Sequence, residues 1–185
     1  MQKLEMTVTE AKFNKVPGKR IFLQALNPQK LTSDYAEWMQ DKDVLRYLTG
    51  RNHAYSTQEL QDYVMKMNDS PLNYMFGIFL NEDNQHIGNI KIGSIDPTHR
   101  FADVGLLIGD KSQWGKGYAT EAILLVTNFA FERLNLNKVT AGMVVTNVGS
   151  YKAFMKAGFK EAGRLSRHVL LDGQFMDQFI LEKCR

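Results

Sequence analysis

The stretch Gln113-Trp114-Gly115-Lys116-Gly117-Tyr118-Ala119-Thr120-Glu121-Ala122 is the most informative part of this chain. It follows a strand-like run at 102–108 and opens a helix-like run at 119–134. Gly115 and Gly117 permit a tight turn in which no Cβ atom keeps the backbone N–H groups from converging on one point. The helix that begins there adds unpaired N–H groups and the positive end of its dipole. The stretch therefore predicts a site for a phosphate or pyrophosphate, and with it a nucleotide-like ligand.

Length and composition indicate an ordinary globular protein. The 185 residues fit one domain over 1–185, with a polar lead-in at 1–19. No apolar run approaches the roughly 20 residues of a membrane helix, and the N-terminus lacks a signal-peptide core, so we expect a cytoplasmic protein with no membrane partner. The net charge of +3 comes from scattered basic residues, which argues against nucleic acid as a partner. Cys184 is the one cysteine, which excludes an internal disulfide and a cysteine metal cluster.

Hydrophobic periodicity and turn signals predict an α+β fold. We expect strands at 20–25, 74–80, 86–95, 102–108 and 138–145, followed by a hairpin around Asp172-Gly173. Helices are expected at 35–48, as one or two segments, after the capping box that begins at Ser56, at 119–134 and at 150–157. This order predicts a mixed, mostly antiparallel seven-stranded sheet flanked by about four helices.

Two familiar phosphate-binding patterns do not match the glycine-rich stretch. The dinucleotide pattern Gly-x-Gly-x-x-Gly has Thr120 in place of its third glycine, and the preceding strands look antiparallel. The P-loop pattern, Gly-x-x-x-x-Gly-Lys-Ser/Thr, is missing. A plainer interpretation stays open, in which the two glycines only make a tight turn between strand and helix.

A second pattern follows at residues 147–159, Asn-Val-Gly-Ser-Tyr-Lys-Ala-Phe-Met-Lys-Ala-Gly-Phe. Together with the stretch at 114–119, it resembles the GNAT superfamily of acyl-CoA-dependent N-acetyltransferases, over roughly residues 20 to 183. Trp114 stands where that family usually has Gln or Arg. The run at 99–105, His-Arg-Phe-Ala-Asp-Val-Gly, is similar to the RimJ/RimL-like branch, in which many members have Glu at the position of Asp103. The resemblance implies the GNAT fold.

The resemblance also implies acetyl-CoA as co-substrate and no metal. Backbone N–H groups of the loop and helix start would bind the diphosphate, and strand N–H groups beside a splayed sheet would contact the thioester carbonyl. Asn147 would orient the amide arm of the cofactor. The expected cofactor-binding residues are Leu106, Leu107, Ile108, Trp114, Gly115, Lys116, Gly117, Tyr118, Ala119, Thr120, Asn147 and Ser150.

Direct transfer to an amine requires a group that removes the proton of the amine. Asp103 is the first candidate; its short side chain would act through a bridging water, and a merely solvated carboxylate is the equal alternative. His99 is the second candidate. For protonation of the leaving thiolate, many family members use a tyrosine where this chain has Phe154, which cannot donate a proton. RimL-like enzymes offer a serine that corresponds to Ser150, although Ser150 could instead be only a helix N-cap.

The resemblance implies acetyl transfer within a ternary complex to a primary amine. Its acceptor would lie between the segments 47–55 and 164–175. Positive and polar residues in and beside these segments are Arg46, Arg51, Asn52, His53, Arg164, Arg167 and His168. They favour an anionic acceptor, such as a nucleotide-linked amino sugar, and a protein N-terminus also fits. The alternatives are a polyamine acetyltransferase acting on spermidine and a non-catalytic acyl-CoA-binding sensor or partner domain. The chain is expected to be a monomer or a homodimer.

Overall fold

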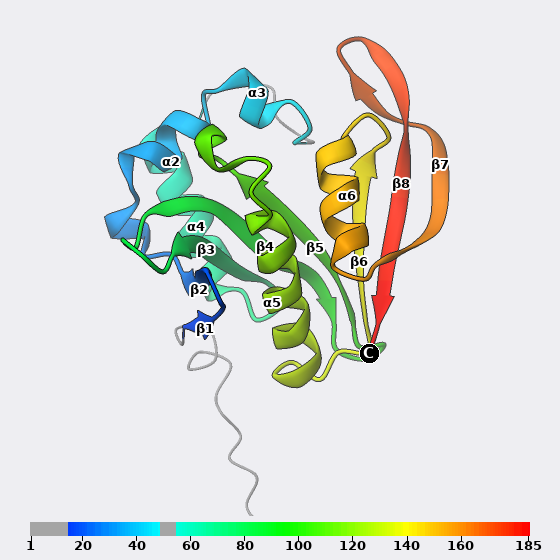
Figure 1. The fold of residues 1–185 in the computed structure, drawn as a ribbon, viewed down its shortest axis with the longest axis horizontal. Coiled ribbons are helices and arrows are strands. Elements are labelled where there is room, and N and C mark those ends of the chain that lie inside the picture. Colours follow the sequence, from blue (N-terminus) through cyan, green and yellow to red (C-terminus); the bar gives the residue numbers. More distant parts are fainter. Residues whose placement is uncertain (1–14, 49–54) are drawn as a thin grey trace, which may run out of the picture.

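The computed structural model describes residues 15–48 and 55–185, and these form an eight-stranded sheet (Figure 1). Neighbouring strands run antiparallel except for one parallel pair, β5 with β6. The sheet order is β1-β2-β3-β4-β5-β6-β8-β7. The strands are β1 (Val16–Pro17), β2 (Ile21–Ala25), β3 (Tyr74–Leu80), β4 (His86–Asp96), β5 (Phe101–Ile108), β6 (Lys138–Val144), β7 (Lys160–Leu171) and β8 (Gln174–Cys184).

The sequence predicted one strand fewer than the described residues form, and the five described α-helices agree with the prediction once the 35–48 region is counted as two segments. The extra strand, β1, has only two residues and lies in the polar lead-in, where no periodicity marks it. The α-helices are α2 (Ser33–Trp38), α3 (Lys42–Leu45), α4 (Thr57–Asp69), α5 (Tyr118–Glu132) and α6 (Val148–Lys156); two 3-10 turns, η1 (Pro28–Lys30) and η2 (Lys111–Gln113), complete the set. None of these described helices is both long and apolar enough to cross a membrane.

Local capping chemistry explains where several elements begin and turn. The region 35–48 is two helices because the Asp41 carboxylate accepts hydrogen bonds from the N–H groups of Asp43 and Val44 and so starts α3 anew. The predicted capping box at Ser56 and Glu59 is confirmed at the start of α4. Asp172 and Gly173 join β7 to β8 with φ of 49° and 76°, the left-handed pair that a tight hairpin turn requires.

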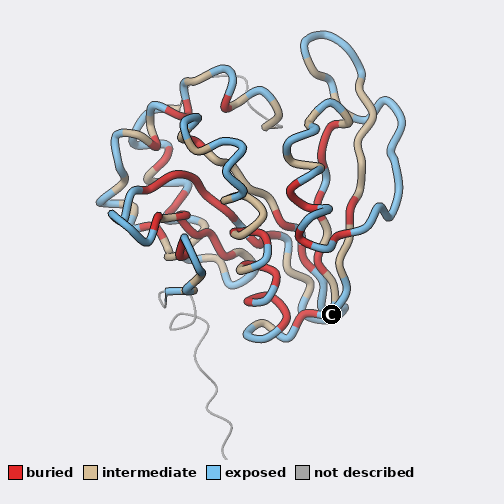
Figure 2. Tube along the Cα trace, viewed as in Figure 1, coloured by how far each residue is buried: buried red, intermediate tan, exposed pale blue. Residues whose placement is uncertain are grey.

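Two apolar clusters cover the two faces of the sheet. Alternate residues of β3 separate between them: Phe76 and Ile78 lie in the larger cluster with α5 and α6, and Met75 lies in the smaller one with α2 and α4. Figure 2 shows that the central strands and the inner side of α5 are buried, whereas β7 is exposed along most of its length. The sheet is therefore held on both faces around β2–β4 and less covered toward β7.

The parallel pair β5–β6 is joined over only a short distance. Its register runs from Phe101↔Lys138 to Asp103↔Thr140 and then stops, although β5 continues to Ile108 and β6 to Val144. Figure 1 shows the two strands meeting near their starts and diverging toward their ends. We call the space between the diverging ends, 104–108 of β5 and 141–144 of β6, the split.

Candidate active site

The split exposes backbone donors of β5. The Gly109 N–H donates to the Ile87 carbonyl at 2.9 Å, and this bond marks Gly109 and Ile87 as a hydrogen-bonded pair of the β4–β5 ladder. Because N–H direction alternates along a strand, the N–H groups of Leu106 and Ile108 are directed away from β4, into the split, whereas the Leu107 N–H is directed toward β4. Of the three predicted strand residues, two therefore have backbone N–H groups without a strand partner on the β6 side.

The glycine-rich loop ends at a helix start that lacks a protein cap. Gly115 and Gly117 have φ of 75° and 85°, so both adopt the left-handed conformation that favours glycine. Gly117 is the N-cap of α5, and no side chain of the described residues accepts a hydrogen bond there. A Cβ built on Gly115 would meet no atom within 4 Å, so the loop is open. The first N–H groups of α5, from Tyr118 to Thr120, are thus directed at an accessible surface, which fits a diphosphate.

An ion pair between Arg20 and Glu121, which the sequence analysis did not predict, stabilises this loop. Arg20, at the start of β2, donates from Nε to Glu121 Oε2 at 2.9 Å and from its backbone N–H to Glu121 Oε1 at 2.8 Å. The same guanidinium donates to the Lys116 carbonyl at 2.9 Å and stacks over the Tyr118 ring at 4.7 Å. Arg20 therefore connects the loop, the first turn of α5 and the sheet.

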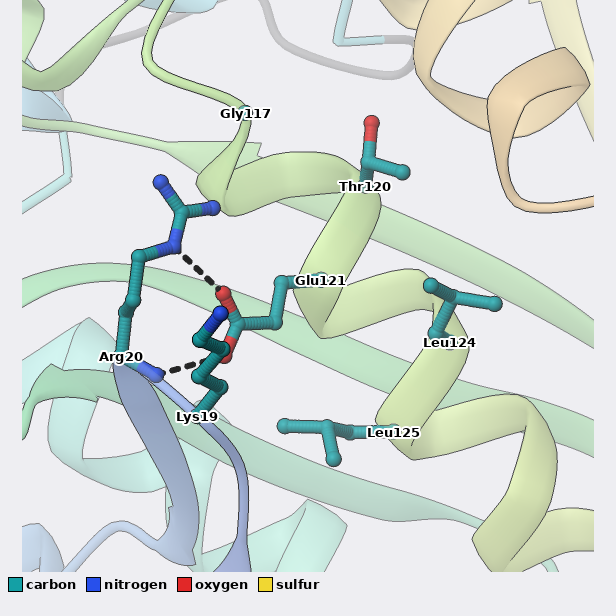
Figure 3. Close-up of a pocket in the computed structure, with 7 residues that line it drawn as sticks. All are labelled: Lys19, Arg20, Gly117, Thr120, Glu121, Leu124 and Leu125. Carbon is teal, nitrogen blue, oxygen red and sulfur yellow. Dashed lines mark hydrogen bonds and ion pairs between the residues drawn. The ribbon is translucent and has the colours of Figure 1, made fainter.

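Arg20 and Glu121 also line a depression on the flank of α5. Figure 3 shows the Arg20 side chain in contact with the Glu121 carboxylate, with Thr120, Leu124 and Leu125 projecting from the same helix. This depression lies toward β2, on the side of α5 away from the split, and does not coincide with the β5 donors. The geometry of the split, rather than this depression, identifies the candidate site.

Trp114 contacts the open edge of β5 directly. Its indole Nε1 donates to the Ile108 carbonyl at 2.8 Å, and 46 % of the residue is exposed. The predicted loop position thus contributes a side chain as well as backbone to the site. Lys116 instead directs its ammonium to the Gln113 amide oxygen at 3.0 Å.

The start of α6 corrects one expectation about Ser150. Asn147 is the N-cap, because its side-chain oxygen accepts the Ser150 N–H at 3.2 Å, so Ser150 is not the capping residue. Ser150 is the third residue of α6 and shares a stripe with Phe154 and Ala157, both buried against the core. Asn147 keeps its side-chain NH₂ group available, since the cap uses only the oxygen. Tyr151 is turned to β7, where its hydroxyl donates to the Glu161 carboxylate.

Asp103 is the last β5 residue that pairs with β6, so it lies at the closed end of the split. Thr140 Oγ1 donates to Asp103 Oδ1 at 3.3 Å across that pair. The residue is accessible to solvent, yet desolvation by the surrounding strands raises the pKa of its carboxyl; the Thr140 hydrogen bond and the positive charge of Lys91 act in the opposite direction. A raised pKa makes this carboxylate a stronger base than an ordinary aspartate.

His99 lies beyond the closed end. It belongs to the β4–β5 turn, where its backbone N–H donates to Asp96 Oδ1 at 2.7 Å, and it is exposed. Leu106 lies five positions beyond Phe101 along the strand, a span of about 17 Å, and His99 is farther still from Leu106. The structure therefore does not bring His99 together with the split.

The predicted acceptor walls are only partly described. Arg51, Asn52 and His53 lie outside the described residues. On the β7–β8 side, Arg164 is bound to Asp177, with Nη2 and Oδ2 2.7 Å apart, so its charge is already matched. Arg167 stacks over the Phe175 ring at 5.7 Å. The expected surplus of positive charge on this wall is smaller than the sequence indicated.

Two known acetyltransferases resemble this chain in sequence. The chain is 29% identical over 174 residues to the probable N-acetyltransferase YjcK of Bacillus subtilis (strain 168), covering 89% of this chain and 93% of that protein. It is 31% identical over 101 residues to spermidine N(1)-acetyltransferase of Vibrio cholerae, covering 54% of this chain and 58% of that protein.

Solved structures share the fold at lower identity. A spermidine N-acetyltransferase from Vibrio cholerae in complex with CoA and spermine superposes with a TM-score of 0.81 at 22% identity, covering 89% of this chain and 95% of that chain. RimJ of Mycobacterium smegmatis in complex with CoA-disulfide has a TM-score of 0.78 at 19% identity, covering 89% of this chain and 81% of that one. The model of the acetyltransferase (GNAT) domain matches residues 20–160. The chain therefore belongs to the GNAT family of acetyltransferases, as its two sequence patterns predicted.

Proposed function

We propose that this protein transfers an acetyl group from acetyl-CoA to a primary amine in a ternary complex. The observation that carries the proposal is the split between β5 and β6, which opens beside the uncapped start of α5. When bound, acetyl-CoA supplies an acyl group activated as a thioester. The N–H groups of Tyr118 to Thr120 would hold its diphosphate, and the side-chain NH₂ of Asn147 would hold its amide arm.

The backbone of β5 stabilises the charge that develops during transfer. As the amine nitrogen forms its bond to the acyl carbon, the carbonyl oxygen gains negative charge. The Leu106 N–H, directed into the split, donates to that oxygen, and the Ile108 N–H is the neighbouring donor. Because the strand is fixed between β4 and the helices, these donors are already oriented before reaction.

Asp103 accepts the proton that the amine must lose. Leu106 lies three positions beyond Asp103 along the strand, about 10 Å, so the proton passes through a bridging water to the Asp103 carboxylate. Thr140 fixes one carboxylate oxygen, which leaves the other for that water. As the carbon–sulfur bond breaks, its electron pair leaves with the sulfur; the Ser150 hydroxyl would give that sulfur a proton and regain one from solvent, while Asp103 returns the amine proton to solvent.

The proposal extends to the chemical class of the amine that accepts the acetyl group. A small amine carrying negative charge, such as a nucleotide-linked amino sugar, is the first candidate, and a protein N-terminus is the second. A polyamine is the specific alternative, because one relative with 31% identity is a spermidine N(1)-acetyltransferase.

The experiment is the release of free CoA from acetyl-CoA, followed with a thiol reagent. The acceptor panel contains a nucleotide-linked amino sugar, spermidine, a ribosomal-protein N-terminal peptide and a blank without amine. Turnover above the blank with one acceptor supports the proposal and assigns the class. Failure of every acceptor, combined with stabilisation by acetyl-CoA, would favour a non-catalytic acyl-CoA-binding domain. Failure without stabilisation would overturn the cofactor site.

A further inference from the structure

A lysine lies beside the candidate base on the sheet face opposite α5. Lys91 of β4 pairs with Gly105 of β5, and Asp103 is two residues before Gly105, so both side chains project from the same face. The Lys91 Cε lies 3.4 Å from where a Cβ on Gly105 would stand and 4.0 Å from where one on Gly93 would stand. Because Gly93 pairs with Asp103, the lysine stem runs across the two glycines toward the carboxylate.

The two glycines leave room on this face for the Lys91 stem, and the Asn73 amide oxygen also lies over Gly93, 3.1 Å from where a Cβ would stand. A larger residue at position 105 would meet the Lys91 stem, so its absence lets the lysine lie flat along the sheet. Lys91 is exposed and has no carboxylate within the 4 Å ion-pair distance among the described residues. Its charge nevertheless acts on Asp103. The pair thus presents one negative and one positive group side by side at the end of the split.

Other carboxylates on the neighbouring strands already have ion-pair or hydrogen-bond partners. Glu182 binds Lys138, Asp177 binds Arg164, and Glu161 accepts the Tyr151 hydroxyl. On β5 to β8, as far as the chain is described, a second ammonium group of an acceptor would therefore find no carboxylate without a partner near Asp103. An anionic group would find the unpaired ammonium of Lys91.

We infer that Lys91 selects an acceptor whose amine lies a short distance from a carboxylate or phosphate, and that it disfavours polyamines. This inference rests on the proposed transfer at the split. The amine is directed to Asp103, and the anionic group of the same molecule is bound by the Lys91 ammonium. The acceptor class is thus an amino acid or a phosphorylated small amine, rather than a polycation.

The test compares pairs of acceptors of which one member carries an anionic group near the amine: glucosamine with glucosamine 6-phosphate, and alaninamide with alanine, each at the same concentration of free amine, plus spermidine. Lys91→Gln removes the charge and keeps the length of the side chain. Lys66→Gln on α4 makes the same change on an exposed lysine remote from the split and serves as control. The wild-type protein should favour the anionic member of a pair by about tenfold in kcat/KM, the factor expected for one charge-assisted contact.

In Lys91→Gln the preference for the anionic member of a pair should fall to about twofold or less, and kcat/KM for the member without an anionic group should not change. Lys66→Gln should keep the wild-type ratio. Equal loss for both members, or a wild-type preference for spermidine, would overturn the inference. If no acceptor is turned over, titration calorimetry of the CoA-loaded protein with the same pairs decides the question. Lysine-dependent binding of the anionic member would uphold the inference while the transfer proposal fails, and binding without that dependence would refute it.

Discussion

Gly117→Ala tests whether the left-handed loop, rather than any glycine near it, builds the cofactor site. Gly117 has φ of 85°, and holding an alanine in that conformation costs about 1–2 kcal/mol. The new Cβ would lie 3.5 Å from the Arg20 guanidinium, an ordinary contact, so steric overlap adds nothing to this figure. The variant either bears the strain in the folded state or relaxes the loop and turns its N–H groups away.

Both responses are measurable. Urea denaturation should give a free energy of unfolding lower by about 1–2 kcal/mol if the loop keeps its shape. Titration calorimetry should give a CoA affinity about tenfold weaker if the loop relaxes, since that factor corresponds to about 1.4 kcal/mol. The loss in unfolding free energy and the loss in CoA binding free energy should together amount to about 1–2 kcal/mol, the cost of holding alanine in the left-handed conformation.

Gly149→Ala is the matched control. Gly149 is an exposed residue of α6, its φ is outside the left-handed range, and a Cβ there would meet no atom within 4 Å. Alanine in a helix is favoured over glycine, so this variant should gain about 0.5–1 kcal/mol and keep its CoA affinity. Equal stability and equal CoA affinity for the two variants would refute the role assigned to the loop.

Three further results are expected. Asp103→Asn should lower kcat by about 100-fold or more and remove the acidic limb of the pH profile of kcat/KM. In the wild type this limb should lie above the ordinary aspartate range, because desolvation raises the pKa of Asp103. An acidic limb that is unchanged in the variant would assign the base to another residue. Burial alone would raise the pKa of Glu121, but the hydrogen bonds from Arg20 lower this pKa overall. The ionised Glu121 therefore stabilises the folded protein above the ordinary carboxylate pKa of 4.5, and this stabilisation is lost as the pH falls through the lowered pKa of the folded state. Glu121→Gln should therefore lose about 1 kcal/mol in denaturation at neutral pH and match the wild type in acid; a pH-independent difference would contradict this. Trp114→Phe removes the hydrogen bond to the Ile108 carbonyl and should lower unfolding free energy by about 1 kcal/mol, whereas no change would show that the exposed bond is replaced by water.

Local chemistry made much of this fold predictable. The capping box at Ser56, the hairpin at Asp172-Gly173 and the glycine loop before α5 each depend on residues close together in the chain. Their conformations follow from side-chain capping and from the freedom of glycine, so the sequence specifies them without tertiary context. A local signal can also stay ambiguous: the sequence left open whether Ser150 was only an N-cap, and the backbone path into α6 makes Asn147 the capping residue instead.

The long-range features of the candidate site could not be predicted in the same way. Arg20 and Glu121 are 101 positions apart, and Trp38 fits against Gly109, where a Cβ would lie 2.0 Å from the indole ring. Neither contact has a sequence signal, because each depends on which surfaces pack together.

The sequence by itself determined the family, most of the elements and the glycine-rich turn before α5, because these depend on residue spacing and local propensity. Only the tertiary structure decided that β5 and β6 separate after Asp103 and that Leu106 and Ile108 are directed into the gap. It also placed Lys91 beside Asp103, through the register of β4 on β5. Strand register and divergence are set by the packing of both sheet faces at once, and that balance involves residues from the whole chain.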